Sequence, residues 1–206
     1  QYVKILKNVL FYELQPRDDG FDSRNIVAGL RDYLPEEGIL TVDVGAHLHL
    51  VGQMWQTPSP EKLLMTNGWS SMGFAIPAAM AAKLCKPELP VACLCGDGGF
   101  LMNAGELVTA KRLNLNIVFV VINDNSLSLI RIKQEKKNYD SNYGTLLDST
   151  TLTSSRYIFG VPVYRVSTQS AYEMALKKAF TAQGPVVIEA LTEGSEYDSL
   201  VLRRNK

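Results

Sequence analysis

Two acidic residues flanked by small or polar residues carry the most distinctive chemistry in this sequence. Asp97 lies in a Gly-Asp-Gly-Gly run that starts at Gly96, and Asp124 lies in an Asn-Asp-Asn run that starts at Asn123. Glycines leave backbone amides unobstructed, which suits a phosphate group, but a carboxylate next to a phosphate repels it. A cation between the two removes this repulsion, and Mg²⁺ prefers carboxylate oxygens. The pattern therefore predicts a phosphate group bound through Mg²⁺.

Each acidic run follows a segment that is typical of a buried strand. Residues 91–95 are apolar on both faces, and residues 117–122 are all apolar and mostly β-branched. Residues 101–113 between them are predicted to form a helix. A strand-helix-strand crossover brings the ends of both strands to the same edge of a parallel sheet. Asp97 and Asp124 are therefore expected to lie side by side.

The rest of the chain continues the alternation of helices and strands. Asp22 or Ser23 can cap a helix that Pro35 ends. The further predicted elements are a strand at 39–44, a loop rich in His, Gln and Pro after residue 45, a helix at 72–84, a strand at 161–166, a helix at 170–183 and a strand at 186–191. We predict an α/β fold with a doubly wound, mainly parallel sheet and helices on both faces.

Two further segments complete the predicted organisation. Residues 1–20 have an irregular apolar pattern that ends in a polar, turn-forming cluster, so they are predicted to be a lead-in or linker segment, followed by one domain at residues 21–206. The polar stretch 133–155 is longer than an ordinary connection and is predicted to be a mobile, lid-like loop. Ligands of such folds bind beyond the carboxyl ends of the strands, which is where both acidic runs are placed.

The composition restricts the class of protein. The chain has 206 residues, of which 46% are hydrophobic and 20% charged, as in globular domains. The 21 basic and 21 acidic residues balance, which disfavours nucleic acid and anionic membranes as partners. No segment reaches the roughly 18 apolar residues of a membrane span, and the start lacks a secretory signal. Three cysteines in apolar surroundings favour a reducing, cytoplasmic location.

Several candidate sites also have ordinary structural explanations. Short glycine runs are common in tight turns, and a dinucleotide fingerprint is incomplete because Leu101 stands where its third glycine belongs. Asp124 taken singly is an ordinary turn residue, and Met72 taken singly is a gap-filling core residue. Glu106, on the predicted helix, has no identifiable partner, and the basic run at 131–137 is interpreted as a solvated face.

A zinc site is the remaining metal hypothesis. It would combine His47 and His49 with Cys93 and Cys95. The two cysteines, however, lie within a predicted buried strand and lack the spacing of metal ligands. Two small core residues are the favoured interpretation of this cysteine pair.

The Gly-Asp-Gly run, followed by the Asn-Asp pair at 123–124, resembles the diphosphate and Mg²⁺ motif of thiamine-diphosphate-dependent enzymes. Residues 67–79 (Asn-Gly-Trp-Ser-Ser-Met-Gly-Phe-Ala-Ile-Pro-Ala-Ala) and residues 100–107 (Phe-Leu-Met-Asn-Ala-Gly-Glu-Leu) resemble acetolactate-synthase-like members. The resemblance covers about residues 22–195. It implies that thiamine diphosphate and Mg²⁺ are the cofactors.

The resemblance also implies roles for individual residues. The implied Mg²⁺ ligands are the side chains of Asp97 and Asp124 and the backbone carbonyl of Ser126. Met72 would lie beneath the bent cofactor and force its V shape. The usual residue at position 124 is Asn, but a carboxylate supplies the same kind of oxygen, so Mg²⁺ binding is expected to survive. The other implied cofactor-binding residues are Ala46, His47, Gly96, Gly98, Gly99 and Leu127.

In the resembled enzymes this segment is the C-terminal, diphosphate-binding domain of a three-domain subunit. The resemblance implies a 2-oxo-acid decarboxylase or carboligase, most like acetolactate synthase, with pyruvate as a candidate substrate. It also implies assembly as a homo-oligomer and a separate pyrimidine-binding domain or subunit, which carries the catalytic glutamate that this chain lacks. The substrate-selecting Trp of biosynthetic acetolactate synthases has no counterpart in residues 130–134.

Two alternatives to this hypothesis remain open. The chain would serve equally well as the diphosphate-binding subunit of a two-subunit 2-oxo-acid decarboxylase. From a different class, a doubly wound domain of this kind can be a non-catalytic nucleotide-binding module. Metal-dependent binding of thiamine diphosphate distinguishes the enzyme from the module.

Overall fold

A seven-stranded sheet forms the centre of the protein, whose computed structural model describes residues 16, 20–139, 143–147 and 156–197. The strand order is β2-β1-β3-β4-β7-β6-β5. All neighbouring strands are parallel except β5 and β6, which pair antiparallel. The predicted α/β fold with a mainly parallel sheet is therefore confirmed.

The described elements follow one another in the predicted alternating manner. In chain order they are α2 (Ser23–Tyr33), β1 (Ile39–Val42), α3 (Ala46–Met54), the 3₁₀ helix η2 (Pro60–Lys62), β2 (Leu63–Met65), α4 (Ala75–Cys85), β3 (Val91–Gly96), α5 (Asp97–Asn103), α6 (Glu106–Arg112), β4 (Ile117–Asn123), α7 (Ser128–Lys136), β5 (Tyr157–Ile158), β6 (Val161–Val166), α9 (Gln169–Phe180) and β7 (Val186–Leu191). The first helix begins at the predicted cap, because the carboxylate of Asp22 accepts a hydrogen bond from the amide of Arg24 at 2.8 Å.

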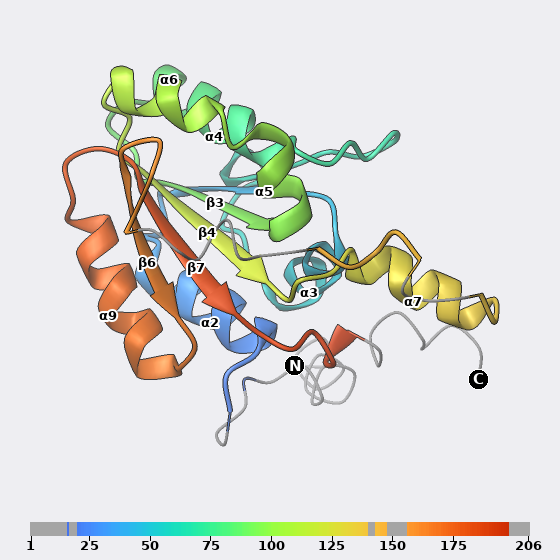
Figure 1. Cartoon of the computed structure of the whole chain (residues 1–206). Coiled ribbons are helices and arrows are strands. Elements are labelled where there is room, and N and C mark those ends of the chain that lie inside the picture. Colours follow the sequence, from blue (N-terminus) through green and yellow to red (C-terminus); the bar gives the residue numbers. More distant parts are fainter. Residues whose placement is uncertain (1–15, 17–19, 140–142, 148–155, 198–206) are drawn as a thin grey trace, which may run out of the picture.

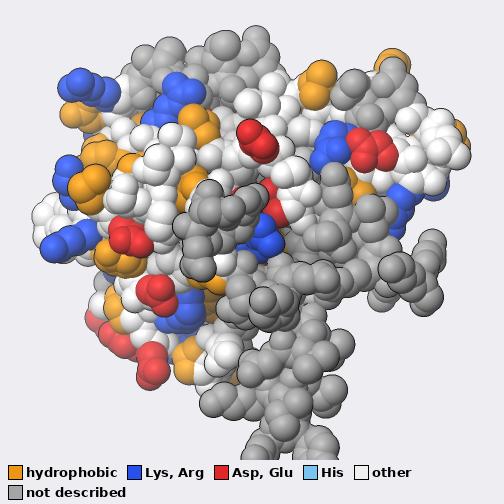
Figure 2. Space-filling view, turned by 90° about the horizontal axis from the view of Figure 1, so that it is seen from below, with side chains coloured by type: hydrophobic (Ala, Val, Ile, Leu, Met, Phe, Trp, Pro, Cys, Tyr) orange, Lys and Arg blue, Asp and Glu red, His pale blue; other side chains and the backbone are white. Residues whose placement is uncertain are grey.

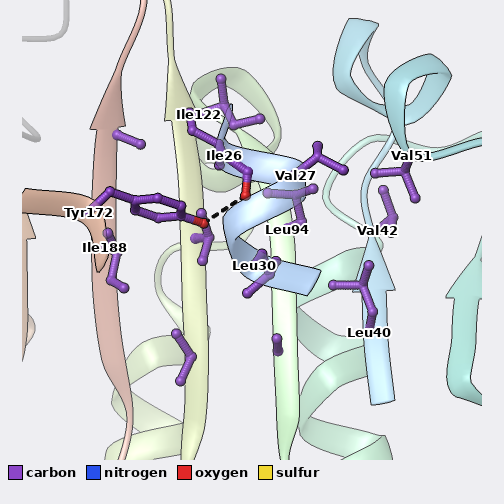
Figure 3. Close-up of a cluster of buried hydrophobic side chains, with 14 of the residues drawn as sticks. Ile26, Val27, Leu30, Leu40, Val42, Val51, Leu94, Ile122, Tyr172 and Ile188 are labelled. Atoms are coloured by element: carbon purple, nitrogen blue, oxygen red, sulfur yellow. Dashed lines mark hydrogen bonds between the residues drawn. The ribbon is translucent and has the colours of Figure 1, made fainter. Parts of the chain in front are cut away.

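Helices cover both faces of the sheet, so the protein has two hydrophobic cores (Figure 1). Leu94 of β3 packs in the core beneath α2, α3 and α9, whereas its neighbour Cys93 packs in the core beneath α4, α5 and α6. Figure 3 shows the first core, where the hydroxyl of Tyr172 donates to the carbonyl oxygen of Ile26 at 3.0 Å and joins α9 to α2. Burial on both faces explains why the central strands are apolar throughout.

The segment after Gly45 is a helix, and the prediction of a loop there was wrong. Ala46, His47, Leu50 and Val51 of α3 are all buried. These positions recur at helical spacing, so the signal was present in the sequence despite the polar residues between them. Because α3 and α4 cover opposite faces, the chain changes sides between β1 and β3, and such switch points open a crevice at the strand ends.

Four other predictions differ from the structure. The helix predicted at 101–113 is two helices, because α5 ends at Asn103 and α6 begins at Glu106. The helix predicted from Met72 begins only at Ala75, so Met72 lies in the preceding turn. The strand predicted at 39–44 ends at Val42. The predicted loop 133–155 begins inside α7, and the short strands β2 and β5 were not predicted.

Parts of two predicted segments lie outside the described residues. These are residues 1–15 and 17–19 of the predicted lead-in, and residues 140–142 and 148–155 of the predicted lid-like loop. Among the helices that are described, none is long and apolar enough to cross a membrane. On the described part of the face in Figure 2, Lys and Arg side chains are interspersed with Asp and Glu.

Candidate functional site

A cavity of about 420 Å³ opens beyond the carboxyl ends of β1, β3 and β4. Residues from the N-terminal turns of α3 and α5, from the turn before α4 and from α7 line it. Figure 1 shows α3 and α7 at this end of the sheet. All ten predicted site residues lie in the cavity wall: Ala46, His47, Met72, Gly96, Asp97, Gly98, Gly99, Asp124, Ser126 and Leu127.

Asp97, the first residue of α5, is a buried carboxylate with an unpartnered oxygen. The side chain is 3% exposed. Its Oδ1 accepts a hydrogen bond from the amide of Gly98 at 2.7 Å, whereas Oδ2 has no hydrogen-bond partner within the described part of the chain. Burial, and then the nearby charge of Asp124, raise the pKa of Asp97 to about 7. A cation at Oδ2 would satisfy this oxygen and favour the charged carboxylate.

Asp124 follows β4 and brings a second carboxylate to the same cavity. Its Oδ1 accepts a hydrogen bond from the amide of Ser126 at 3.2 Å, and its Oδ2 accepts one from the hydroxyl of Ser128. Burial raises the pKa of Asp124, the Ser128 hydrogen bond opposes this shift, and the charge of Glu196 adds to it. Two carboxylates in one partly dry site repel each other, so the site favours a divalent cation between them.

Neighbouring segments hold the loop that carries Asp124 in place. The side-chain amide of Asn123 donates to Oε1 of the buried Glu189 at 2.6 Å, and its Oδ1 accepts from the amide of Asn125 at 3.1 Å. The amide of Leu127 donates to the carbonyl oxygen of Thr145 at 2.7 Å. The contribution of residues 145–147 was not predicted, because nothing in a polar segment shows which loop it pairs with.

The glycine run is the first turn of α5, and its interpretation as a loop before the helix was wrong. Gly98 and Gly99 are needed for space: neither has a positive φ, but a Cβ at either would overlap with a side chain. At Gly98 that side chain is Leu127, with the methyl group of Met72 also nearby at 3.3 Å. At Gly99 it is the carboxylate of Asp43. The run therefore lets α5 approach both neighbouring segments closely.

Asp43, at the end of β1, fixes the turn that carries Met72. Its Oδ2 accepts a hydrogen bond from the amide of Gly73 at 3.0 Å, and its Oδ1 accepts from Ala75 at 3.4 Å. The side-chain amide of Asn103 donates to the carbonyl oxygen of Gly73 at 2.7 Å. Sequence reasoning missed Asp43, although an acidic residue at the end of a buried strand was the available signal.

The comparison with known families assigns this arrangement. Residues 43–190 match the family model described as "Thiamine pyrophosphate enzyme, C-terminal TPP binding domain", where TPP is another name for thiamine diphosphate. The chain belongs to this family. The matched segment begins at Asp43 and contains all ten predicted site residues, so these lining residues belong to the part of the chain that matches the family.

The curated relatives of this TPP-binding domain include acetolactate synthases. It is 32% identical to the acetolactate synthase of Bacillus subtilis over 175 aligned residues. The alignment covers 85% of this chain and 30% of the relative. It is 30% identical over 167 residues to a probable acetolactate synthase large subunit of Methanococcus aeolicus, covering 79% of this chain and 27% of the relative. The acetolactate synthase isozyme 2 large subunit of Escherichia coli is 30% identical over 162 residues, covering 77% of this chain and 29% of the relative. The chain thus spans less than a third of these relatives.

The donors in the cavity of the TPP-binding domain fit a diphosphate held through Mg²⁺. Mg²⁺ prefers oxygen ligands, and Asp97 and Asp124 supply two carboxylates in addition to the backbone of the loop at Ser126. A cation would satisfy the unpartnered, buried Oδ2 of Asp97. A Cβ on Gly98 would overlap with a terminal methyl group of Leu127, so a side chain there would narrow the cradle unless Leu127 moved.

His47 of the TPP-binding domain is a neutral group in the cavity wall. Burial lowers the pKa of this imidazole to about 4, and a hydrogen bond to the backbone of Asp43 only partly offsets the shift. Its Nε2 has no hydrogen-bond partner among the described residues. His47 therefore adds no positive charge to the cavity near neutral pH.

The segment after β7 closes the metal side of the cavity, and this was not predicted in detail. Tyr197 lines the cavity, and its hydroxyl hydrogen-bonds with that of Ser23 at 2.6 Å. Oε1 of Glu196 accepts from the amide of Ser23 at 2.8 Å. Gly194 lies directly against the side chain of Asp124. Residues 198–206, which follow this segment, lie outside the described residues.

The other sequence candidates are placed away from this chemistry. Cys93 and Cys95 are buried within the sheet core beneath α4, whereas His47 lines the cavity, so the four proposed zinc ligands are not brought together. Within the described ranges, no group of three or more His, Cys, Asp or Glu side chains is placed to hold a metal. Glu106 is exposed at the start of α6, outside the cavity wall.

Proposed function

We propose that this chain is the diphosphate- and Mg²⁺-binding part of a thiamine-diphosphate-dependent 2-oxo-acid decarboxylase or carboligase, most like acetolactate synthase. The observation that carries the proposal is the unpartnered, buried Oδ2 of Asp97 beside the second carboxylate of Asp124. The family match at residues 43–190 and the acetolactate synthase relatives support the same function.

In this proposal the chain binds and orients the cofactor. The carboxylates of Asp97 and Asp124 and the carbonyl of Ser126 hold Mg²⁺, and the amides at the start of α5 hold the diphosphate together with the loop at Ala46 and His47. The side chains of Leu127 and Met72 form an apolar wall that excludes water and supports the bent cofactor. When bound, thiamine diphosphate supplies a carbon nucleophile and an electron sink for decarboxylation of a 2-oxo acid.

The aminopyrimidine end of the cofactor needs a second domain or subunit in this proposal, and assembly as a homo-oligomer is the expected way to provide it. Leu101 and Met102 of α5 and Val108 of α6 are exposed to 44%, 58% and 52%. Exposed apolar side chains next to the glycine cradle favour a docking partner over this surface. A 2-oxo acid is the proposed substrate class, of which pyruvate is the member that the sequence resemblance implied.

Calorimetric titration of the purified chain with thiamine diphosphate tests the proposed function. We expect binding in the presence of Mg²⁺ and a large loss of affinity when EDTA removes the metal, because the diphosphate and the two carboxylates repel each other without a cation. ADP with Mg²⁺ serves as the matched control for a nucleotide-binding module. Tight binding of ADP, with no binding of thiamine diphosphate, would overturn the proposal in favour of that module.

A further inference from the structure

Lys133 of α7 differs from the other residues of the cavity wall. Its side chain is basic, and the proposed cofactor site gives it no role. The run 131–137 was interpreted as a solvated face, but Lys133 also lines the cavity, one helical turn after Ile130 on the same side of α7. It is the one Lys or Arg among the described lining residues. It has no hydrogen-bond or ion-pair partner in the part of the chain that the structure describes.

Lys133 lies at the end of α7 that is farther from Asp124, where the diphosphate and Mg²⁺ are proposed to bind. Ser128, whose hydroxyl contacts Asp124, marks the metal end of α7. Lys133 lies roughly 7–8 Å further along the helix axis, because each residue adds about 1.5 Å. Leu129 and Ile130 line the cavity between these two ends. The backbone of Lys133 therefore lies toward the part of the cavity that is farther from Asp124.

Lys133 is exposed to solvent, so water partly screens its attraction for an anion. On the same helix, the charges of Arg131 and Glu135 are paired with each other at 2.8 Å. His47, the buried imidazole of the wall, is neutral near pH 7. Lys133 is thus the strongest fixed positive charge that the described cavity wall offers.

We propose that Lys133 makes this site select 2-oxo acids whose side chain ends in a second anionic group, such as a carboxylate, over alkyl 2-oxo acids such as pyruvate. The inference rests on the proposed function and names its substrate class. The ammonium group donates a charge-assisted hydrogen bond to the distal anion, whereas the 1-carboxylate and the reacting carbonyl lie toward the cofactor. An alkyl side chain of the same size would leave Lys133 without a partner in the closed site.

The test uses the enzyme that contains this chain together with its pyrimidine-binding domain or subunit, loaded with thiamine diphosphate and Mg²⁺. The two probes are 2-oxoglutarate and 5-methyl-2-oxohexanoate, which have nearly the same shape because an isopropyl group replaces the carboxylate. We expect Lys133→Met to lower the ratio of their kcat/KM values by about tenfold, as for the loss of one charge-assisted hydrogen bond. Lys137→Met, at the C-cap of the same helix and outside the cavity wall, is the matched control and should leave the ratio unchanged.

A binding measurement separates this inference from the proposed function. Calorimetry should give the same Mg²⁺-dependent affinity for thiamine diphosphate in the wild type and in Lys133→Met. A wild type that prefers the alkyl acid, or a Lys133→Met variant with an unchanged ratio, would overturn the inference while intact cofactor binding preserves the proposed function. A loss of cofactor affinity in Lys133→Met would assign this lysine to the diphosphate and also overturn the inference. If the wild type binds no thiamine diphosphate, the proposed function itself fails.

Discussion

Asp97→Asn is expected to abolish Mg²⁺-dependent binding of thiamine diphosphate and, at the same time, to stabilise the cofactor-free chain. The amide is a poorer Mg²⁺ ligand than a carboxylate and brings no charge. It retains an oxygen that can accept the hydrogen bond from the amide of Gly98, so the start of α5 is preserved. It also removes a buried charge next to Asp124, which is the source of the gain in stability.

The sign of the stability effect depends on pH. The pKa of Asp97 is raised from its ordinary value of 3.8 to about 7, so the folded state holds this proton more tightly than the unfolded chain. The free energy of unfolding of the wild type therefore falls as the pH rises from about 4 to about 7. Above this range the charged carboxylate costs on the order of 2–4 kcal/mol, which Asp97→Asn should recover. Urea unfolding at pH 5 and pH 8 measures this difference, and a variant less stable than the wild type at pH 8 would contradict it.

Asp124→Asn is the control for this prediction. It restores the side chain that is usual in the resembled enzymes and keeps an oxygen ligand, so Mg²⁺-dependent cofactor binding should survive. Because the charge of Asp124 helps to raise the pKa of Asp97, the substitution should also bring that pKa closer to its ordinary value. If both variants lost binding equally, the distinction between the two carboxylates would be wrong.

Gly99→Ala is the second substitution with a large expected effect. A Cβ at this position overlaps with Oδ2 of Asp43. This carboxylate cannot move away without breaking the hydrogen bonds that its Oδ2 accepts from the amide of Gly73 and its Oδ1 accepts from the amide of Ala75. We expect a loss of about 3 kcal/mol in the free energy of unfolding, combining overpacking with a broken buried hydrogen bond. The turn that carries Met72 should shift as well, which should weaken cofactor binding.

Gly105→Ala provides a matched control for the substitution of Gly99. Gly105 precedes α6 with φ −58° and ψ −26°, and a Cβ there meets no atom within 4 Å. Alanine should therefore be tolerated or slightly stabilising. Chemical unfolding of the two variants compares them directly. Equal stabilities would show that the space at Gly99 is not limiting.

Much of the fold follows from local patterns in the sequence. Residues 91–95 and 117–122 are apolar at every position, as strands covered on both faces must be, and the structure places them at the centre of the sheet. Asp22 marks the start of α2 because its side chain caps the helix. Asp97 and Asp124 follow the neighbouring parallel strands β3 and β4. A single strand-helix-strand crossover connects these strands, and this is why their carboxyl ends lie side by side.

The parts that the sequence did not reveal depend on contacts between distant segments. Asp43 is important because the turn at Gly73 and the helix at Gly99 both pack against it. An acidic residue after a buried strand is a signal for a site, but it does not show which distant segments the side chain contacts. Tyr197 lines the cavity, and its hydroxyl is hydrogen-bonded to Ser23, which lies 174 positions earlier in the sequence. Lys133 belongs to a basic run whose composition suggests a solvated face, and only the direction of α7 places it in the cavity wall.

The most direct test of the proposed metal site is a crystal structure of the chain with thiamine diphosphate and Mn²⁺ in place of Mg²⁺, in which anomalous scattering locates the metal. We predict one Mn²⁺ ion within about 2.5 Å of a carboxylate oxygen of Asp97, a carboxylate oxygen of Asp124 and the carbonyl oxygen of Ser126, with diphosphate oxygens completing the coordination. Mn²⁺ bound elsewhere, or bound to the diphosphate with neither carboxylate as a ligand, would contradict the account.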